Sequence, residues 1–333
     1  MNILKKIALK QKQLPYSRWD LLHFLGLDQR RYQTARGSRI LVYHGVCHED
    51  PFRFNTLFIT EKRFEAHLTY YKKYFNLISL EDFYAQRFSS EKFNVCLTFD
   101  DGFANNYRYV LPLLEKYQIP ATFFITAITE AGYDILWNDL LTIASKYGPD
   151  VFTFNTADYR KNRYNKYVTS DGIALAEQLR LTGFGEKAAL IKHLNSLVDF
   201  KNNDRDKDYW VQMDTQQIRA LSASSHVTIG SHGYYHNDLS QISPEDMLSE
   251  MTLSKQFLEK VTGKEVTSIA FPYGAYTEKT LEMAKAAGYS QLLCTDFNHP
   301  TDHDAVFLRE RLTINPYISA ASQLHATIKG RYE

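Results

Sequence analysis

Two short segments, far apart in the chain, carry side chains that can bind a metal ion and move a proton. The segment TFDDG at residues 98–102 contains Asp100 and Asp101, and SHGYYH at residues 231–236 contains His232 and His236. On one helical turn, the i,i+4 spacing would place both imidazoles on the same face. Two imidazoles and one carboxylate are a common ligand set for a catalytic zinc ion that keeps an open position. The second carboxylate is then free to act as a base, so the pattern predicts a metal hydrolase.

Each of these patterns also has a plain structural interpretation. Adjacent acids are common on exposed loops, although a buried pair repels unless a cation or a proton relieves it. Histidine pairs at i,i+4 also arise by chance. Asp100-Asp101 and His232 each follow an apolar run, and this joint occurrence favours one shared site.

Short apolar runs alternate with segments of helical periodicity from about residue 38 onward, which predicts a parallel sheet, open or closed into a barrel. In an α/β barrel the carboxyl ends of the strands carry the active site. His44, at the end of the first run, would face the same mouth as Asp100 and His232. The expected strands lie at 40–43, 76–80, 94–99, 121–125, 227–229, 268–271 and 291–294, and the expected helices at 61–74, 81 onward, 105–117, 215–223, 244–261 and 277–287.

Residues 130–213 interrupt this alternation. They are polar, rich in Lys, Asn, Asp and Tyr, and indicate loops with helices at 173–181 and 186–198. The simplest interpretation is an insertion between two barrel strands that forms a wall or lid. We therefore expect a basic N-terminal extension at 1–37 and a barrel domain at 38–328 that contains the insertion.

Composition limits the class of protein. The 333 residues are 44% hydrophobic and 23% charged, with a net charge of +1, as in ordinary globular proteins and without support for a nucleic-acid partner. Three cysteines without a CxxC pattern favour a reducing compartment, and Cys96 is expected to be a small buried hydrophobe. No run approaches the roughly 18 apolar residues of a membrane span, and no signal peptide is evident, so a cytoplasmic location is expected.

The N-terminal segment has two interpretations. Residues 1–36 contain eight Lys or Arg and two Asp. They could form a basic amphipathic segment in peripheral contact with an anionic membrane, or a helical extension packed on the main domain.

The segment FPYG at residues 271–274 is either a simple turn after a strand or a turn that directs a backbone N–H into the cleft to hold an oxyanion. TFDDG, SHGYYH and FPYG, in this order, resemble the first three motifs of the polysaccharide deacetylases, carbohydrate esterase family 4. The resemblance runs from about residue 38 to 328 without the insertion, and residues 111–117 and 119–124 also resemble the family.

The resemblance implies a distorted (β/α) barrel and a divalent metal, usually Zn²⁺, with Co²⁺ or Ni²⁺ as alternatives. Asp100 would match the catalytic base, and Asp101, His232 and His236 would match the metal ligands. The backbone N–H of Tyr273 would match the oxyanion donor.

The chain departs from the family pattern at three points. Gly233 replaces the usual Ser or Thr after the first ligand histidine, and Ala270 stands where many members carry an Arg that orients the base. Arg311 is the candidate replacement. A late Leu-x-His motif for the acid is not evident, and His325 falls in a helix-like tail. The pair YH at 43–44 resembles the N-terminal strand that supplies this histidine in some exopolysaccharide deacetylases, which makes His44 the candidate acid.

These patterns predict a metal-dependent N-deacetylase of an N-acetylhexosamine-containing polysaccharide or glycolipid, most similar to exopolysaccharide- or envelope-type deacetylases. Trp137 is expected to stack on the sugar at the edge of the insertion or to be a core tryptophan. Two alternatives remain. One is an O-acetyl sugar esterase with the same site, and the other is a non-catalytic glycan-binding protein on a degenerate scaffold.

Overall fold

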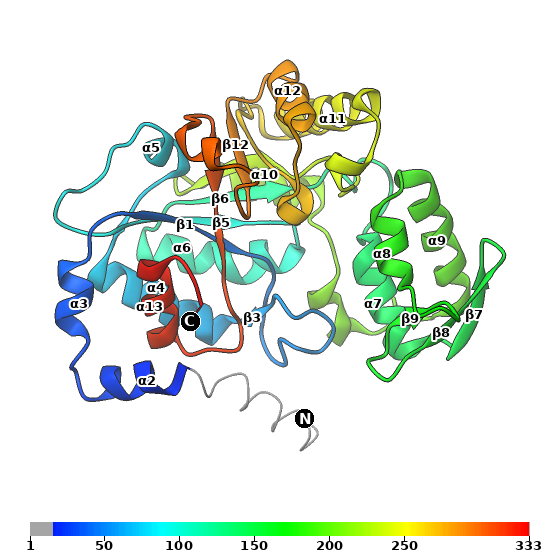
Figure 1. Cartoon of the computed structure of the whole chain (residues 1–333), viewed down its shortest axis with the longest axis horizontal. Helices are drawn as coiled ribbons and strands as arrows, with labels where there is room; N and C mark the ends of the chain where they lie inside the picture. Colours follow the sequence, from blue (N-terminus) through cyan, green and yellow to red (C-terminus); the bar gives the residue numbers. More distant parts are fainter. Residues whose placement is uncertain (1–15, 333) are drawn as a thin grey trace.

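The computed structural model describes residues 16–332. Its centre is a parallel sheet that curves almost into a closed barrel (Figure 1). The strands of this sheet are β1 (Ser38–Tyr43), β4 (Asn76–Leu77), β5 (Asn94–Phe99), β6 (Ala121–Ile125), β10 (Val227–Ser231), β11 (Ser268–Ala270), β12 (Gln291–Cys294), β13 (Leu308–Glu310) and β14 (Leu312–Thr313). Their order is β13-β12-β11-β10-β6-β5-β1-β14, with β4 beside β5.

The last two strands bring the sheet back towards its beginning. Only Arg311 separates β13 from β14. The segment thus pairs with β12 through β13 and with β1 through β14, in both cases parallel. This arrangement confirms the predicted distorted (β/α) barrel.

Helices cover the outside of the barrel, and most begin at a side-chain cap. Thr60 accepts from the backbone N–H of Arg63, and Asp214 forms a capping box with Gln217, which satisfies N–H groups that the first helical turn leaves unpaired. The helices of this layer are α4 (Glu61–Tyr74), α5 (Leu80–Tyr84), the short π-helix η2 (Asn106–Val110), α6 (Leu111–Tyr117), α10 (Thr215–Ala223), α11 (Pro244–Thr262), α12 (Glu278–Ala286) and α13 (Ala320–Lys329).

The two faces of the strands serve different cores. Leu97 and Phe99 of β5 pack against the helix layer, whereas Cys96, in the same strand, packs inside the barrel with Ile40 and Phe124. The interior is tight, because a Cβ on Gly230 would lie 2.4 Å from a ring carbon of Phe124. Period-2 alternation therefore sends even-numbered residues of β1, β5 and β10 towards the barrel axis.

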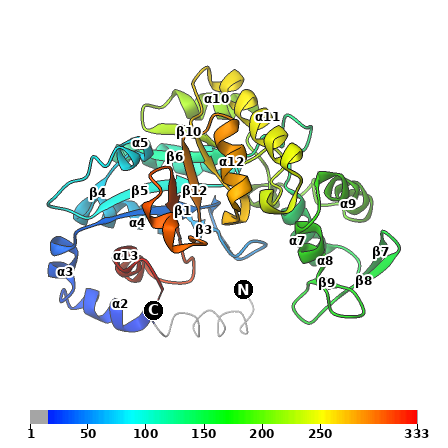
Figure 2. The same ribbon diagram turned by 45° about the horizontal axis from the view of Figure 1, so that its top comes forward.

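Between β6 and β10 the chain forms a second hydrophobic cluster beside the barrel, seen in green in Figures 1 and 2. The predicted helices at 173–181 and 186–198 are present with shifted ends. A three-stranded antiparallel sheet, which the sequence analysis missed, accompanies them. The elements are α7 (Trp137–Tyr147), β7 (Val151–Phe154), β8 (Ala157–Lys161), β9 (Tyr167–Val168), α8 (Leu175–Arg180), α9 (Phe184–Leu197) and the 3₁₀ turn η3 (Asp204–Tyr209). We call residues 130–213 the insertion. That they form part of one domain with the barrel stays a prediction.

Two short helices, α2 (Ser17–Phe24) and α3 (Gln29–Thr34), precede the barrel. Trp19 of α2 stacks on His325 of α13 with ring centroids 3.3 Å apart, so this part of the N-terminal extension packs on the barrel. Residues 1–15 of the predicted basic segment lie outside the described residues. Within residues 16–332, no helix is long and apolar enough to cross a bilayer.

Candidate metal and acid–base site

Asp100 and Asp101 lie where β5 leaves the barrel. Asp100 continues the inward-facing series of Cys96 and Thr98, and it is buried. Asp101 has a left-handed backbone with φ 76°, followed by Gly102 at φ 85°. This sharp turn separates the two buried carboxylates, so the side chain of Asp101 meets different partners from that of Asp100.

The two histidines do not lie on a helical turn, and that expectation is wrong. β10 ends at Ser231, and the chain then follows an irregular loop in which Gly233 and His236 have φ of 77° and 58°. The loop brings the His232 and His236 ring centroids to 5.1 Å. Left-handed residues, rather than helical periodicity, therefore put both rings on one side.

The ligand atoms of Asp101, His232 and His236 lie within 4.8 Å of one another and are buried. Nε2 of His232 lies 3.4 Å from Oδ1 of Asp101, and Nε2 of His236 lies 3.2 Å from the same oxygen. A carboxylate and two imidazole nitrogens at these separations fit one divalent cation. The donor set does not by itself decide among Zn²⁺, Co²⁺ and Ni²⁺.

Backbone and side-chain contacts fix this loop. Nδ1 of His232 lies 2.8 Å from the carbonyl oxygen of Ala270, which can only accept, so Nδ1 carries the proton and Nε2 keeps a free lone pair for a metal. Glu250 of α11 accepts hydrogen bonds from the backbone N–H of Tyr235 and from the side chain of Asn237. Both bonds brace the segment that presents His236.

Arg311 forms the orienting pair for Asp100. Its Nη1 and Nη2 donate to the two carboxylate oxygens of Asp100, each at 2.7 Å, and Nη1 also reaches Thr98 Oγ1 at 3.2 Å. Bidentate guanidinium–carboxylate pairs are strong and geometrically specific. Ala270, where the resemblance would predict an arginine, faces the same barrel interior, so a guanidinium from the β13–β14 segment can occupy this interior instead.

The electrostatic environment keeps both carboxylates ionised. Burial acts to raise the pKa of Asp100, but Arg311 and His232 outweigh it and hold this pKa below its usual range. Burial opposes ionisation of Asp101 too, yet its bonds to His232 and His236 leave the pKa well below the ordinary value. Burial lowers the pKa of His236, which favours the neutral imidazole that a metal requires.

The other predicted residues lie around this group. His44 follows β1 and is close enough to Asp100 and Asp101 to influence the pKa of both carboxyls, so it lies at the same mouth of the barrel. Tyr273 has a left-handed φ of 62° in the FPYG turn, and its ring centroid lies 5.0 Å from that of His236. His325, by contrast, stacks on Trp19 outside the barrel.

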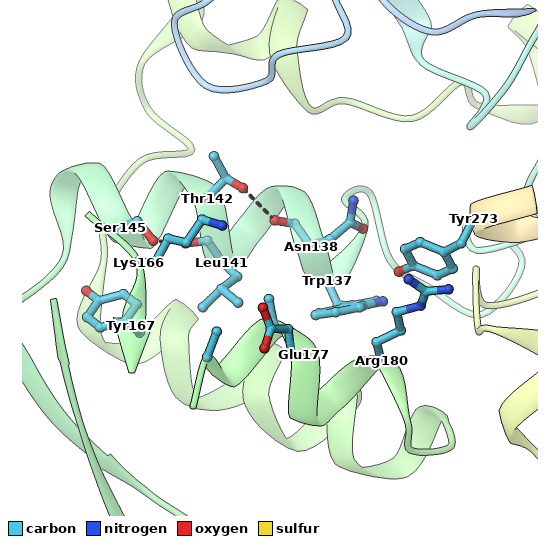
Figure 3. A pocket seen from close by; sticks show the side chains of 12 residues that line it. Trp137, Asn138, Leu141, Thr142, Ser145, Lys166, Tyr167, Glu177, Arg180 and Tyr273 are labelled. Atoms are coloured by element: carbon cyan, nitrogen blue, oxygen red, sulfur yellow. Dashed lines mark hydrogen bonds between the residues drawn. The ribbon is translucent and has the colours of Figure 1, made fainter. Parts of the chain in front are cut away.

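Trp137 is only 2% exposed and belongs to the core of the insertion. This burial contradicts a sugar-stacking platform and favours the alternative of a core tryptophan. Figure 3 shows that it still lies next to a cleft, between Glu177 and the pair of Arg180 and Tyr273.

Two residues near the site were not singled out from the sequence. Asp139 of α7 is buried, and burial together with the charge of Asp101 raises its pKa well above the ordinary value. Its position two residues after Trp137 was the only available signal. Arg180 of α8 places its guanidinium carbon 4.6 Å from the ring centroid of Tyr273 and pairs with Asp238 at 2.7 Å. No local pattern marks that long-range contact.

Comparisons with known proteins identify the family of this chain. A sequence model of the family described as polysaccharide deacetylase matches residues 89–169 and 200–292. The chain is 22% identical over 292 residues to YxkH of Bacillus subtilis (strain 168), a protein assigned by name to the polysaccharide deacetylases. That match covers 85% of this chain and 73% of YxkH.

Solved structures share the fold at low sequence identity. The deacetylase PplD of Streptococcus pyogenes, in complex with acetate, aligns with a TM-score of 0.53 and 20% identity over 87% of this chain and 97% of PplD. IcaB from Ammonifex degensii aligns with a TM-score of 0.53 and 18% identity over 89% of this chain and 98% of IcaB. These similarities establish the barrel architecture.

Proposed function

The chain belongs to the polysaccharide deacetylase family, and from this premise we propose that it is a metal-dependent hydrolase that removes N-acetyl groups from an N-acetylhexosamine-containing polysaccharide or glycolipid. The observation that carries the proposal is the buried group of Asp101, His232 and His236, with Asp100 and its guanidinium partner Arg311 beside it. A scaffold that had lost catalysis would have no evident need to keep these charges buried.

In this proposal Asp101, His232 and His236 hold a divalent ion, most simply Zn²⁺. When bound, such an ion polarises the acetyl carbonyl and makes water a better nucleophile at neutral pH. Asp100 acts as the base that accepts the proton of the attacking water. Arg311 keeps Asp100 ionised and aims its carboxylate into the mouth of the barrel.

The remaining roles belong to His44 and Tyr273. The left-handed backbone of Tyr273 lies beside the ligand group, where an N–H can donate to the oxygen that becomes negative. Departure of the sugar amine requires a proton, and His44 at the end of β1 is the candidate donor. Its Nδ1 is buried and has no hydrogen-bond partner within residues 16–332, so no protein contact there blocks proton transfer at that atom.

The proposal is tested by acetate release from N-acetylated oligosaccharides and lipid-linked sugars with added Zn²⁺ or Co²⁺. Asp100→Asn is measured beside the wild type, and the exposed Asp171→Asn is the matched control. We expect release that both a chelator and Asp100→Asn abolish, with bound metal unchanged in the variant. If the wild type neither binds metal nor releases acetate, the non-catalytic glycan-binding alternative replaces the proposal.

The bond that is cleaved is tested separately with His44→Ala. An amide has a poor leaving group and needs the proton from His44, so we expect about a 10²-fold loss of kcat/KM on the N-acetyl substrate. With an O-acetyl ester of the same sugar, His44→Ala should lower kcat/KM far less, because an ester has a better leaving group. Faster cleavage of the ester by the wild type, with no dependence on His44, would favour the O-acetyl esterase.

A further inference from the structure

A cleft next to the metal-ligand group has a chemistry that the proposed reaction does not use. It has a volume of about 310 Å³ and lies between α7, β9 and α8 of the insertion, and Tyr273 closes one end (Figure 3). Because the ring of Tyr273 is 5.0 Å from that of His236, this end of the cleft lies beside the metal-ligand group. The family sequence model omits residues 170–199, so the wall formed by α8 lies outside the conserved pattern that this model describes.

Several polar atoms around this cleft are buried without a protein partner. Within residues 16–332, Nε1 of Trp137, Oδ1 of Asn138 and the hydroxyl of Tyr273 make no hydrogen bond. Trp137 is 2% exposed, so its N–H has been removed from bulk water. A buried donor or acceptor without a partner is destabilising. A ligand that can both donate and accept would relieve all three groups, and a sugar hydroxyl does both.

The rest of the cleft suits an uncharged ligand. Leu141 and Ala174 supply an apolar surface, against which the C–H groups of a sugar ring can pack. The charge of Arg180 is offset by Asp238 at 2.7 Å. Lys166 and Glu177 contribute one charge of each sign. The cleft therefore has hydrogen-bonding capacity without excess charge, which favours a neutral glycan over a phosphate or a carboxylate.

We propose that this cleft binds a neutral sugar unit that adjoins the reacting N-acetylhexosamine, so that the enzyme acts on a glycan chain and not on a single sugar. The inference rests on the proposed function and adds the length of the substrate. In this inference Asn138 and the side chain of Tyr273 contact the neighbouring sugar, and the metal-ligand group acts on the N-acetylhexosamine that reacts.

The test fills the cleft without touching the metal-ligand group. Ala176 is exposed on α8 and lines the cleft, so Ala176→Trp should block it. Ala189 is exposed on α9 and lines a different cavity of the insertion, so Ala189→Trp is the matched control. The substrates are tetramers of N-acetylglucosamine with different linkages and the methyl glycoside of the monomer.

For one linkage, we expect the wild type to prefer the tetramer over the monomer by about tenfold or more in kcat/KM. Ala176→Trp should abolish this preference and leave the monomer rate within about twofold, whereas Ala189→Trp should change neither. Equal rates of the wild type on both substrates, or an equal loss on both in Ala176→Trp, would overturn the inference.

A binding measurement separates failure of this inference from failure of the proposed function. Calorimetric titration of Asp100→Asn with the tetramer does not require turnover. Tetramer binding that Ala176→Trp removes would support the cleft even if acetate release failed. Acetate release with no length preference and no tetramer binding would keep the function and reject the cleft.

A second surface carries an independent inference. α2 and the turn after it expose Leu21, Phe24, Leu25 and Leu27, with Phe24 86% exposed. α2 packs on α13 through Trp19 and through Asp20, which accepts a hydrogen bond from Ser322. The apolar side chains of this region therefore face outward, whereas a surface helix of a globular protein usually turns its apolar face towards the core.

The exposed charges around this surface are more often positive than negative. Arg18 and Arg30 are exposed and flank it in the sequence. Of the two acids, Asp20 is exposed but accepts hydrogen bonds from Ser319 and Ser322, and Asp28 is buried against His23. In the sequence, residues 1–15 add four lysines and no acid. Exposed leucine and phenylalanine flanked by basic residues match the requirements for binding at an anionic lipid surface.

We infer that residues 16–31 dock the enzyme on an anionic membrane. The test is co-sedimentation with vesicles of phosphatidylcholine, with or without phosphatidylglycerol, at low and high salt. We expect binding only with phosphatidylglycerol, weakened by salt, and at least about fivefold weaker in Phe24→Ser/Leu25→Ser. Leu181→Ser, at a leucine 60% exposed on the insertion, is the matched control. Absence of vesicle binding, or a dimer that the double variant converts to a monomer, would overturn the inference.

Discussion

The barrel and the insertion differ in what their interiors contain. The barrel interior holds an ion pair between Asp100 and Arg311 and ends in the ligand group of Asp101, His232 and His236. The insertion has a mainly apolar cluster, and the hydroxyl of Tyr273, Nε1 of Trp137 and Oδ1 of Asn138 are buried near its border with the barrel. This difference indicates a division of labour, in which the barrel supplies the chemistry and the insertion selects the substrate.

Polar contacts join the two regions next to the metal-ligand group. Arg180 pairs with Asp238, and Lys187, which is fully buried, donates to the side chain of Asn237. Burial lowers the pKa of Lys187 to about 8. Asp238 and Asn237 directly follow His236, so the insertion contacts the loop that carries a metal-ligand candidate. Substitutions on either side of this border therefore test whether the barrel supplies the chemistry and the insertion selects the substrate.

The largest effect is expected for Arg311→Ala. It leaves the buried carboxylate of Asp100 without a partner, which should lower the free energy of unfolding by about 3–5 kcal/mol. The pKa of Asp100 should rise, so the acidic limb of kcat/KM should move to higher pH. Urea unfolding and a pH–rate profile measure both changes.

Arg39→Ala is the control for Arg311. Arg39 pairs with Glu310 at 3.6 Å and is partly exposed, so its loss should cost less than about 1 kcal/mol. Arg311→Lys keeps the charge but loses the bidentate geometry, and should fall between the wild type and Arg311→Ala. Full activity in Arg311→Ala would show that Asp100 needs no orienting partner.

Two matched cavity-creating substitutions test whether the cores of the barrel and of the insertion are separate. Leu97 of the barrel and Leu190 of the insertion are both fully buried. Each Leu→Ala change should cost about 2–5 kcal/mol in the region that contains it. Leu97→Ala should weaken metal binding, and Leu190→Ala should spare it while making the insertion more sensitive to proteolysis. Equal loss of metal binding in both variants would mean that the two regions unfold together.

The sequence predicted the barrel better than the insertion for a physical reason. Parallel strands give continuous apolar runs, and the ends of these runs located His44, Asp100 and His232. The antiparallel strands of the insertion are short, and the alternating pattern of Val151–Phe154 was too brief to stand out among polar neighbours.

The geometry of the candidate site was less accessible to prediction. A helical turn for His232 and His236 was wrong because the left-handed backbone at Gly233 and His236 has no periodic signature. The motifs suggested a substitute arginine, and only the closure of the barrel shows that Arg311 reaches Asp100. The contacts of Arg180 depend on how two distant segments pack, which no local pattern encodes.

The pH dependence of stability is expected to come partly from His67, a fully buried residue of α4. Burial, helped by the charge of Arg63, lowers the pKa of His67 to about 3, whereas an unfolded histidine titrates near 6.5. Between these values the unfolded chain binds more protons, so this contribution to stability is full above pH about 6.5 and falls as the pH drops. The loss should approach 1.4 kcal/mol per pH unit, or roughly 3 kcal/mol at pH 4.

Urea unfolding from pH 4 to 8 measures this dependence. His67→Gln should flatten this pH dependence, because glutamine does not titrate in this range. Glutamine can also keep the hydrogen bond to the hydroxyl of Tyr43, which lies 3.0 Å from Nδ1 of His67. Leu190→Ala should keep the wild-type slope, since the titrating group belongs to the barrel. An unchanged slope in His67→Gln would assign the acid sensitivity to other groups.

The smallest effect is expected for Arg180→Ala, at the border itself. Its side chain is 43% exposed, so solvent screens the pair with Asp238 and the stability cost should stay near or below about 1 kcal/mol. The change also uncovers one face of Tyr273, so kcat/KM on an oligosaccharide should fall by about three- to tenfold, mainly through KM. Arg180→Lys should recover the share of kcat/KM that depends on the positive charge, but not the share that depends on the planar guanidinium against Tyr273. A loss of bound metal, or a fall in kcat beyond about 10²-fold, would place the insertion within the catalytic machinery and end the division between the two regions.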